Sequence, residues 1–216
     1  MITYPRDFPD ADIVAPRCRF DYTTLGEMSR TAAGAITFQE RIGGSLWELA
    51  VTTKPLNETE YGKWHAWYLS LRGGRQSFMG RDPRRCWPLA YGPGVLSLTR
   101  AGGGAFDGTC NVTAVAGDTI TLGNLPASYK ISVGDYVSFP WLGGRALVKA
   151  LEPITGTTGG VAGPFTVGPW QRTGGAVPAV GTLVKAWCLM RPKPGSWQGE
   201  RGVVEPVTFE AIQTLV

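Results

Sequence analysis

The stretch NETEYGKWHAWYLSLRGG, residues 57–74, decides how the rest of the chain is interpreted. Asn57 can serve as an N-cap, Glu60 three residues later can complete a capping box, and Gly73 supplies a stop signal. Between these boundaries, apolar residues recur at steps of three and four, which is the period of one helix face. The residues of this face are Tyr61, Trp64, Tyr68 and Leu71, with Trp67 at its flank. The stretch therefore predicts an amphipathic helix whose aromatic face packs against a sheet.

The residue types that carry catalysis form no recognisable pattern in the chain. His65 is the only histidine and lies outside the apolar helix face, with no second His and no Cys nearby to complete a metal site. The chain has no G-x-S-x-G motif and no P-loop. Four widely spaced cysteines predict free buried thiols; they are Cys18, Cys86, Cys110 and Cys188. We expect no enzymatic activity, catalytic residue, cofactor or metal. Catalysis by a pair of carboxylates stays open as an alternative, because the two acids need no fixed spacing in the sequence.

Alternation of apolar and polar residues predicts strands before the helix and at the end of the chain. Three such runs are CRFDYTT (18–24), AITFQE (35–40) and SLWELAVTT (45–53), and the glycine turn at 42–44 predicts a hairpin of the last two. A further alternating run lies in GVVEPVTFEAIQTLV (202–216). A terminal strand needs a sheet to join, so we expect it to return to the first sheet.

The sequence pattern in the middle of the chain predicts a second, smaller β domain. Short strand-like runs separated by glycine turns follow one another from about 95 to 190, which favours a small sandwich or Greek-key barrel. The glycine-rich interval 155–181 is interpreted as a loop-bearing hairpin. The predicted fold is mainly β: a β-sandwich with one α-helix, formed by residues 1–90 and 190–216, carrying an inserted OB-like small β-barrel at 91–189.

Charge indicates neither nucleic-acid binding nor a membrane protein. The net charge of +4 is small and scattered. The densest basic run contains Arg75, Arg81, Arg84 and Arg85, which fits either a solvated loop or a contact with an interface or ligand. The N-terminus MITYPRDFPDADIV lacks the pattern of a signal peptide, and no apolar run approaches the ~20 residues of a membrane span. We expect synthesis in the cytoplasm and no association with a membrane.

Five tryptophans follow the predicted helix, in or beside predicted turns and strands. They are Trp87, Trp141, Trp170, Trp187 and Trp197. Exposed Trp on a barrel can stack on sugars or unpaired bases, and Trp141 and Trp170 are the candidates for such contacts. The alternative is that these side chains belong to the core or to a protein interface.

Four segments together resemble one protein family. They are KPLNETEYGKWHAWYLSLRGGRQSFMGRDP, AGDTITLGNLPASYKISVGDYVSF, KAWCLMRPKPGSW and EPVTFEAIQTLV. In content and order they resemble the distal tail (Dit-like) proteins of long-tailed, siphovirus-type bacteriophages, in the compact type with an inserted OB-fold domain.

The resemblance implies a structural virion protein located at the tail tip. It implies a homo-hexameric ring that joins the tail tube protein to the tail tip or baseplate hub protein, with the inserted domain on the outside. The alternative function is a carbohydrate- or nucleic-acid-binding barrel of a tail-tip complex, with a host surface glycan as one partner.

Overall fold

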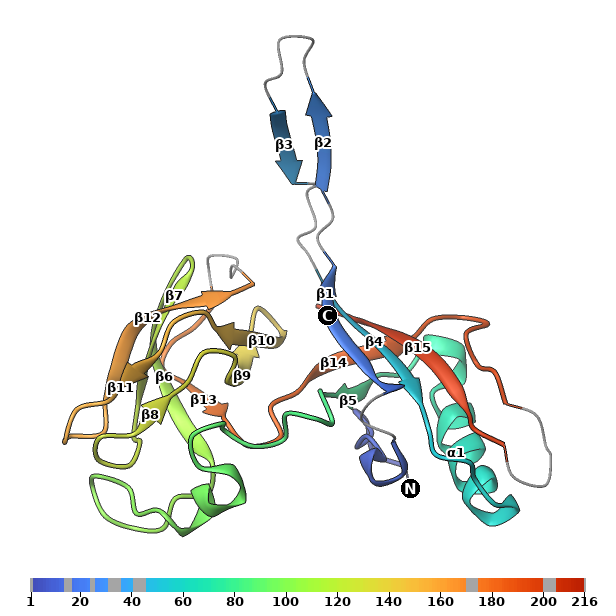
Figure 1. Ribbon diagram of the computed structural model, residues 1–216, viewed down its shortest axis with the longest axis horizontal. Coiled ribbons are helices and arrows are strands. Elements are labelled where there is room, and N and C mark those ends of the chain that lie inside the picture. The colour runs from blue at the N-terminus through green and yellow to red at the C-terminus, as the bar shows by residue number, and fades with distance from the viewer. Residues whose placement is uncertain are drawn as a thin grey trace.

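The computed structural model describes residues 2–13, 17–23, 26–30, 36–40, 46–169, 175–199 and 205–215. The part of the chain so described contains one α-helix, α1 (Glu58–Ser70), and fifteen strands. The strands are β1 (Arg19–Thr23), β2 (Gly26–Arg30), β3 (Ile36–Glu40), β4 (Leu46–Thr52), β5 (Phe78–Gly80), β6 (Thr109–Ala116), β7 (Thr119–Gly123), β8 (Lys130–Ile131), β9 (Tyr136–Trp141), β10 (Gly144–Ala150), β11 (Ile154–Thr155), β12 (Ala162–Gly168), β13 (Ala179–Thr182), β14 (Cys188–Pro192) and β15 (Thr208–Gln213). In Figure 1 the barrel lies to the left of the sheet and α1 to its right. The expected mainly β class with one helix and a small barrel is confirmed.

The first domain is a five-stranded sheet in the order β1-β4-β15-β14-β5. Its last strand, β15, pairs antiparallel with β4, with Phe209 opposite Val51. The predicted return of the terminal strand to the first sheet is therefore confirmed. Because β5 and β14 are neighbours in the sheet, the six barrel strands and the small β8–β11 sheet all lie, along the chain, between two adjacent strands of the first domain.

The predicted pairing of the strands before the helix is wrong. β3 pairs with β2, and β4 pairs instead with β1, with Phe20 opposite Leu49. A glycine turn marks where the chain reverses but does not select the partner strand. The β2–β3 hairpin projects away from both domains (Figure 1).

Helix α1 forms as the sequence predicts. Asn57 accepts a hydrogen bond from the Glu60 N–H at 2.9 Å, and the Glu60 carboxylate accepts one from the Asn57 N–H at 3.1 Å. Trp64 and Trp67 are buried against the sheet, while Tyr61 and Tyr68 are partly buried at its side. After the C-cap Leu71 the chain leaves the helix through two left-handed residues, Arg72 at φ 52° and Gly73 at φ 61°.

The second domain is a closed barrel with strand order β10-β12-β7-β6-β13-β9. It has a core of its own, which includes Phe139 and Phe165. The interpretation of the glycine-rich interval as one hairpin is wrong, because β12 pairs with β7 and β10 whereas β13 pairs with β6 and β9. Glycine lets the chain turn but gives no information about register, which long-range pairing decides.

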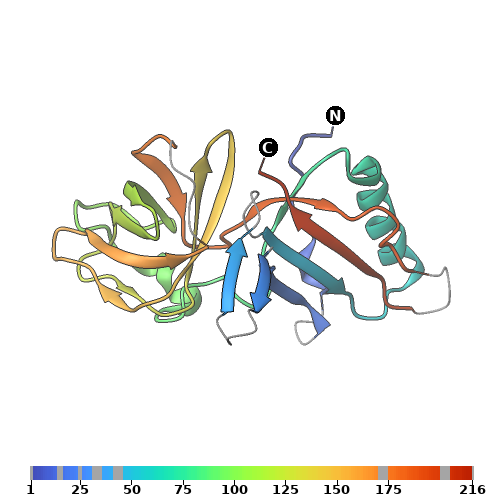
Figure 2. The same cartoon turned by 90° about the horizontal axis from the view of Figure 1, so that it is seen from above.

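The two domains share a buried junction on the helix side of the sheet. The Trp47 indole N–H donates to the Leu147 carbonyl of β10 at 2.8 Å, and its ring stacks on Phe20 at 5.1 Å. Tyr136 of β9 meets the Trp47 ring edge to face at 5.6 Å. One sheet face is thus covered by α1 over part of its length and by Tyr136 and Leu147 of the barrel beside Phe20 and Trp47. Figure 2 shows the barrel and α1 at opposite ends of the sheet.

Candidate functional site

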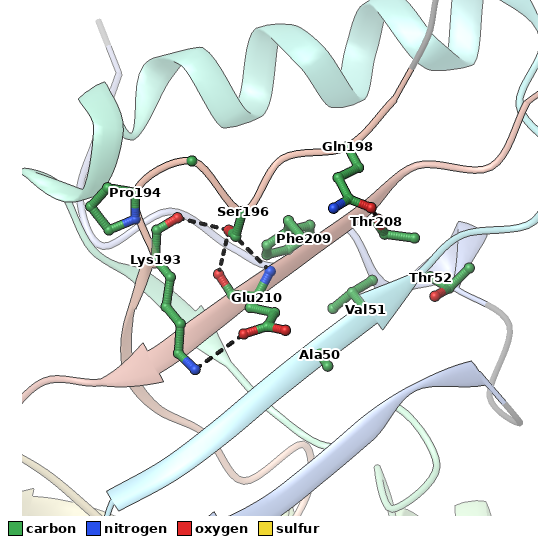
Figure 3. Close-up of a pocket in the computed structure, with 11 residues that line it drawn as sticks. Ala50, Val51, Thr52, Lys193, Pro194, Ser196, Gln198, Thr208, Phe209 and Glu210 are labelled. Atoms are coloured by element: carbon green, nitrogen blue, oxygen red, sulfur yellow. Dashed lines mark hydrogen bonds and ion pairs between the residues drawn. The ribbon is translucent and has the colours of Figure 1, made fainter.

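A groove of about 370 Å³ lies on the sheet, between strands β4 and β15 and the segment that follows β14. This segment bulges away from β15 between two anchors: the Lys193 N–H donates to the Glu210 carbonyl at 2.8 Å, and Gln198 and Thr208 exchange two backbone hydrogen bonds at 2.8 Å. Figure 3 shows the lining side chains around this bulge. The lining residues are Ala50, Val51, Thr52, Lys193, Pro194, Gly195, Ser196, Gln198, Thr208, Phe209 and Glu210.

The charges of the groove are balanced by one another. The Lys193 ammonium lies 3.1 Å from the Glu210 carboxylate and 3.4 Å from that of Glu48, and Arg19 extends the row at 3.7 Å from Glu48. The hydrogen bond with Glu210 raises the pKa of Lys193, so this lysine is protonated at neutral pH. Ser196 accepts the Glu210 N–H at 3.2 Å, and its hydroxyl donates to the carbonyls of Lys193 at 2.7 Å and Glu210 at 3.0 Å. The groove therefore offers polar contacts that are largely satisfied within the chain.

The predicted helix face serves packing within the subunit. The Tyr68 ring lies 4.5 Å from that of Trp197, and His65 stacks on Tyr61 at 5.7 Å. Phe209 of β15 contacts both α1 and Trp197. Trp197 thus packs against one side of α1, and His65 is part of the aromatic cluster formed there with Tyr61 and Trp197.

The basic run divides into one buried and three exposed arginines. Arg81 is only 5% exposed; its guanidinium donates to Asp7 at 2.9 Å, to Asp10 at 2.8 Å and to the Phe8 carbonyl at 3.1 Å. This contact fastens the N-terminal segment to the end of β5, so its prediction as an interface or ligand contact does not fit its burial. The other three, Arg75, Arg84 and Arg85, are exposed, and Arg84 pairs with Asp82 at 3.2 Å.

The two tryptophans predicted to stack on a ligand differ in what the structure describes. Trp141 is half-buried at the end of β9, with its ring edge to face with Phe139 at 5.6 Å. The Gly175 backbone lies so close to the Trp141 indole that a Cβ at this glycine would overlap the ring. Trp170 lies outside the described residues. One side of the Trp141 indole is therefore already occupied within the subunit.

Arg145 at the start of β10 was missed by the sequence patterns. Its guanidinium carbon lies 4.2 Å from the centre of the Trp187 ring, and its Nε donates to the Ser138 hydroxyl at 3.0 Å. Ser138 is fully buried. The only sequence signal is an arginine beside the Gly143-Gly144 turn, and the distance to Trp187 along the chain conceals the contact.

The four cysteines are free thiols. Burial raises the pKa of the Cys18 and Cys110 thiols to about 12, which keeps them protonated at neutral pH. Among the described residues no group of three His, Cys, Asp or Glu could hold a metal ion. None of the helices described is both long and apolar enough to cross a membrane.

Comparison of the sequence with models of known protein families gives no match, and comparison with curated proteins gives none either.

Proposed function

We propose that this chain is a structural protein of a bacteriophage tail, a distal tail protein whose subunits form a hexameric ring between the tail tube and the tail tip or baseplate. The observation that carries the proposal is the insertion topology. A sheet built from both parts of the chain and braced by one helix holds a closed barrel between adjacent strands β5 and β14. This is the arrangement that the resemblance of the sequence leads one to expect.

Two further features favour assembly. Strand β1 is an edge of the sheet, with β4 as its one neighbour in the sheet order of the described strands. An open edge presents unpaired N–H and C=O groups, and a closed ring is one way to cover them. The β2–β3 hairpin projects from the body (Figure 1), and a two-stranded hairpin alone is marginally stable in water. A neighbouring subunit or tail protein would supply the surface that such an arm needs.

Negative-stain microscopy tests the proposal directly. The purified protein, alone and mixed with its tail tube protein, should give six-fold rings, with the barrels at the periphery. Sedimentation velocity on the same samples gives the mass of the assembly. A chain that stays monomeric alone and with both the tube and the hub protein contradicts the proposal.

The alternative, a carbohydrate- or nucleic-acid-binding barrel, makes a different demand. It requires an accessible aromatic platform, and the described candidate is the half-buried Trp141. Binding to a glycan array or to single-stranded oligonucleotides that is lost in Trp141→Ala, by a protein that forms no ring, favours this function. The exposed Arg75, tested as Arg75→Gln, separates a general effect of positive charge from stacking.

A further inference from the structure

The guanidinium of Arg145 is held in a fixed plane on the barrel. Its Nε donates to the Ser138 hydroxyl at 3.0 Å, and one Nη donates to the Ser138 carbonyl at 3.4 Å. The indole of Trp187 covers one face, with the guanidinium carbon 4.2 Å from the ring centre. Contacts of this kind remove most of the rotational freedom of an arginine side chain before any partner binds.

This charge has no carboxylate partner among the described residues. Two other arginines with little exposure have one: Arg81 pairs with two aspartates, and Arg100 pairs with Asp107 at 2.5 Å. Arg6, also partly buried, donates to the Ser70 hydroxyl. At Arg145, burial lowers the pKa of the guanidinium, because the charged form is partly removed from water. A charge desolvated in this way is costly unless an opposite charge meets it.

The unused donors of Arg145 suit one carboxylate. A guanidinium has five N–H groups, and Ser138 takes Nε–H and one N–H of an Nη. The N–H groups that remain on the two Nη atoms point along the outer edge of the plane, where two oxygens of a carboxylate can accept side by side. One positive charge balances one carboxylate, whereas a phosphomonoester of charge about −2 would stay half compensated.

The opposite end of the barrel carries exposed acids. Asp118 lies in the turn between β6 and β7, and Glu152 follows β10. The two are neighbours through β12, since the Asp118 carbonyl accepts the Val167 N–H and the Glu152 carboxylate accepts the Thr166 N–H. Neither has an ion pair within the described part of the chain. Because Arg145 begins β10 and Glu152 follows its end, the two charges are separated by roughly 20 Å at the usual rise of a strand.

We propose that Arg145, with Trp187 and Ser138, is a docking site for the carboxylate of Asp118 or Glu152 of a second copy of this chain. A head-to-tail contact places different patches of one surface against each other, which is the geometry that closes a ring. The inference rests on the proposed ring and assigns to the inserted barrel a share of the subunit contact.

Single substitutions at Arg145 and at a matched exposed arginine give the first test. Sedimentation velocity and negative stain should show wild-type rings in Arg75→Gln, and association weaker by an order of magnitude or more in Arg145→Gln. Arg145→Lys keeps the charge without the planar edge and should fall between them. Circular dichroism and thermal melting confirm that each variant is folded. Equal association of folded Arg145→Gln and wild type overturns the proposal.

Charge reversal identifies the partner residue. Arg145→Glu should abolish association, and adding Glu152→Arg or Asp118→Arg to the same chain should restore it, since the reversed pair is again complementary. Failure of both double variants to restore association overturns the docking site. If Arg145→Gln still forms rings, the proposed ring is supported and the proposed Arg145 contact is refuted. If the wild type forms open chains that depend on Arg145, the contact is supported and the ring is refuted.

Discussion

Replacing Trp47 should separate the unfolding of the two domains. Trp47 is 3% exposed and contacts the barrel directly, by the hydrogen bond to the Leu147 carbonyl and by the ring contact with Tyr136. Truncating a buried tryptophan to alanine costs about 3–5 kcal/mol. Trp47 belongs to the core of the sheet, which reaches Tyr136 and Leu147 at the junction, whereas the barrel has a separate core. The loss therefore falls on the sheet and the junction and leaves the barrel core intact.

A milder change isolates the hydrogen bond. Trp47→Phe keeps an aromatic ring but leaves the Leu147 carbonyl buried without its donor, which costs about 1–3 kcal/mol. Trp64→Phe is the matched control, since its indole N–H donates to Asp12 at 3.1 Å within the first domain. The Asp12 carboxylate is partly exposed and can accept from water, so we expect a smaller cost of about 1 kcal/mol.

Differential scanning calorimetry and urea unfolding measure both effects. The wild type and Trp64→Phe should unfold in one transition, and Trp47→Ala should show two, with the barrel and the sheet melting apart. The urea midpoint gives the loss of stability in Trp47→Phe. A single cooperative transition in Trp47→Ala, or a loss well below 1 kcal/mol, would refute the role of this residue as the coupling point.

Three further substitutions test the first domain by urea unfolding. Trp64→Ala should cost about 3–5 kcal/mol, since the side chain is 2% exposed between α1 and the sheet, and an unchanged midpoint would contradict the assigned helix face. Asn57→Ala removes half of the capping box and should cost about 1 kcal/mol, whereas Asn57→Ser should recover most of it. Arg81→Met should destabilise by about 1–3 kcal/mol, because it removes the buried guanidinium that pairs with Asp10, whose side chain is only 21% exposed. Burial raises the pKa of Asp7, but Arg81, the Phe8 N–H and Lys185 together lower it below the usual 3.8. The ionised Asp7 therefore stabilises the fold above pH 3.8, and this stabilisation is lost as the pH falls through the pKa of the folded state. Arg81→Met should weaken this loss of stability in acid.

The sequence predicts best what local chemistry decides. The boundaries of α1 follow from a capping box four residues long and from Gly73, and both lie within the segment itself. The return of β15 follows from the alternation of Val207, Phe209 and Ala211, which has meaning only if a sheet receives one face. These predictions needed no knowledge of distant partners.

The parts that were missed depend on contacts between residues far apart in the chain. In the sequence Arg81 is one arginine of a basic run, but the carboxylates that it pairs with, Asp7 and Asp10, lie more than seventy residues earlier. Trp67 lies at the flank of the predicted stripe but is buried, because Phe78 and Phe209 arrive from distant strands. Periodicity describes which side chains share a face, whereas burial depends on what covers that face.

The insertion point has a consequence for how such a protein can evolve. Gly80 at the end of β5 lies opposite Cys188 at the start of β14, so the chain leaves the sheet and rejoins it at one rung of the ladder. A Cβ at Gly80 would overlap the Met190 side chain, so the close packing at this position leaves no room for a larger residue. A different domain can therefore be inserted between β5 and β14 without changing the strand order of the sheet, provided that it offers Trp47 a carbonyl and an apolar surface. The sequence of the inserted domain can then vary more than that of the sheet.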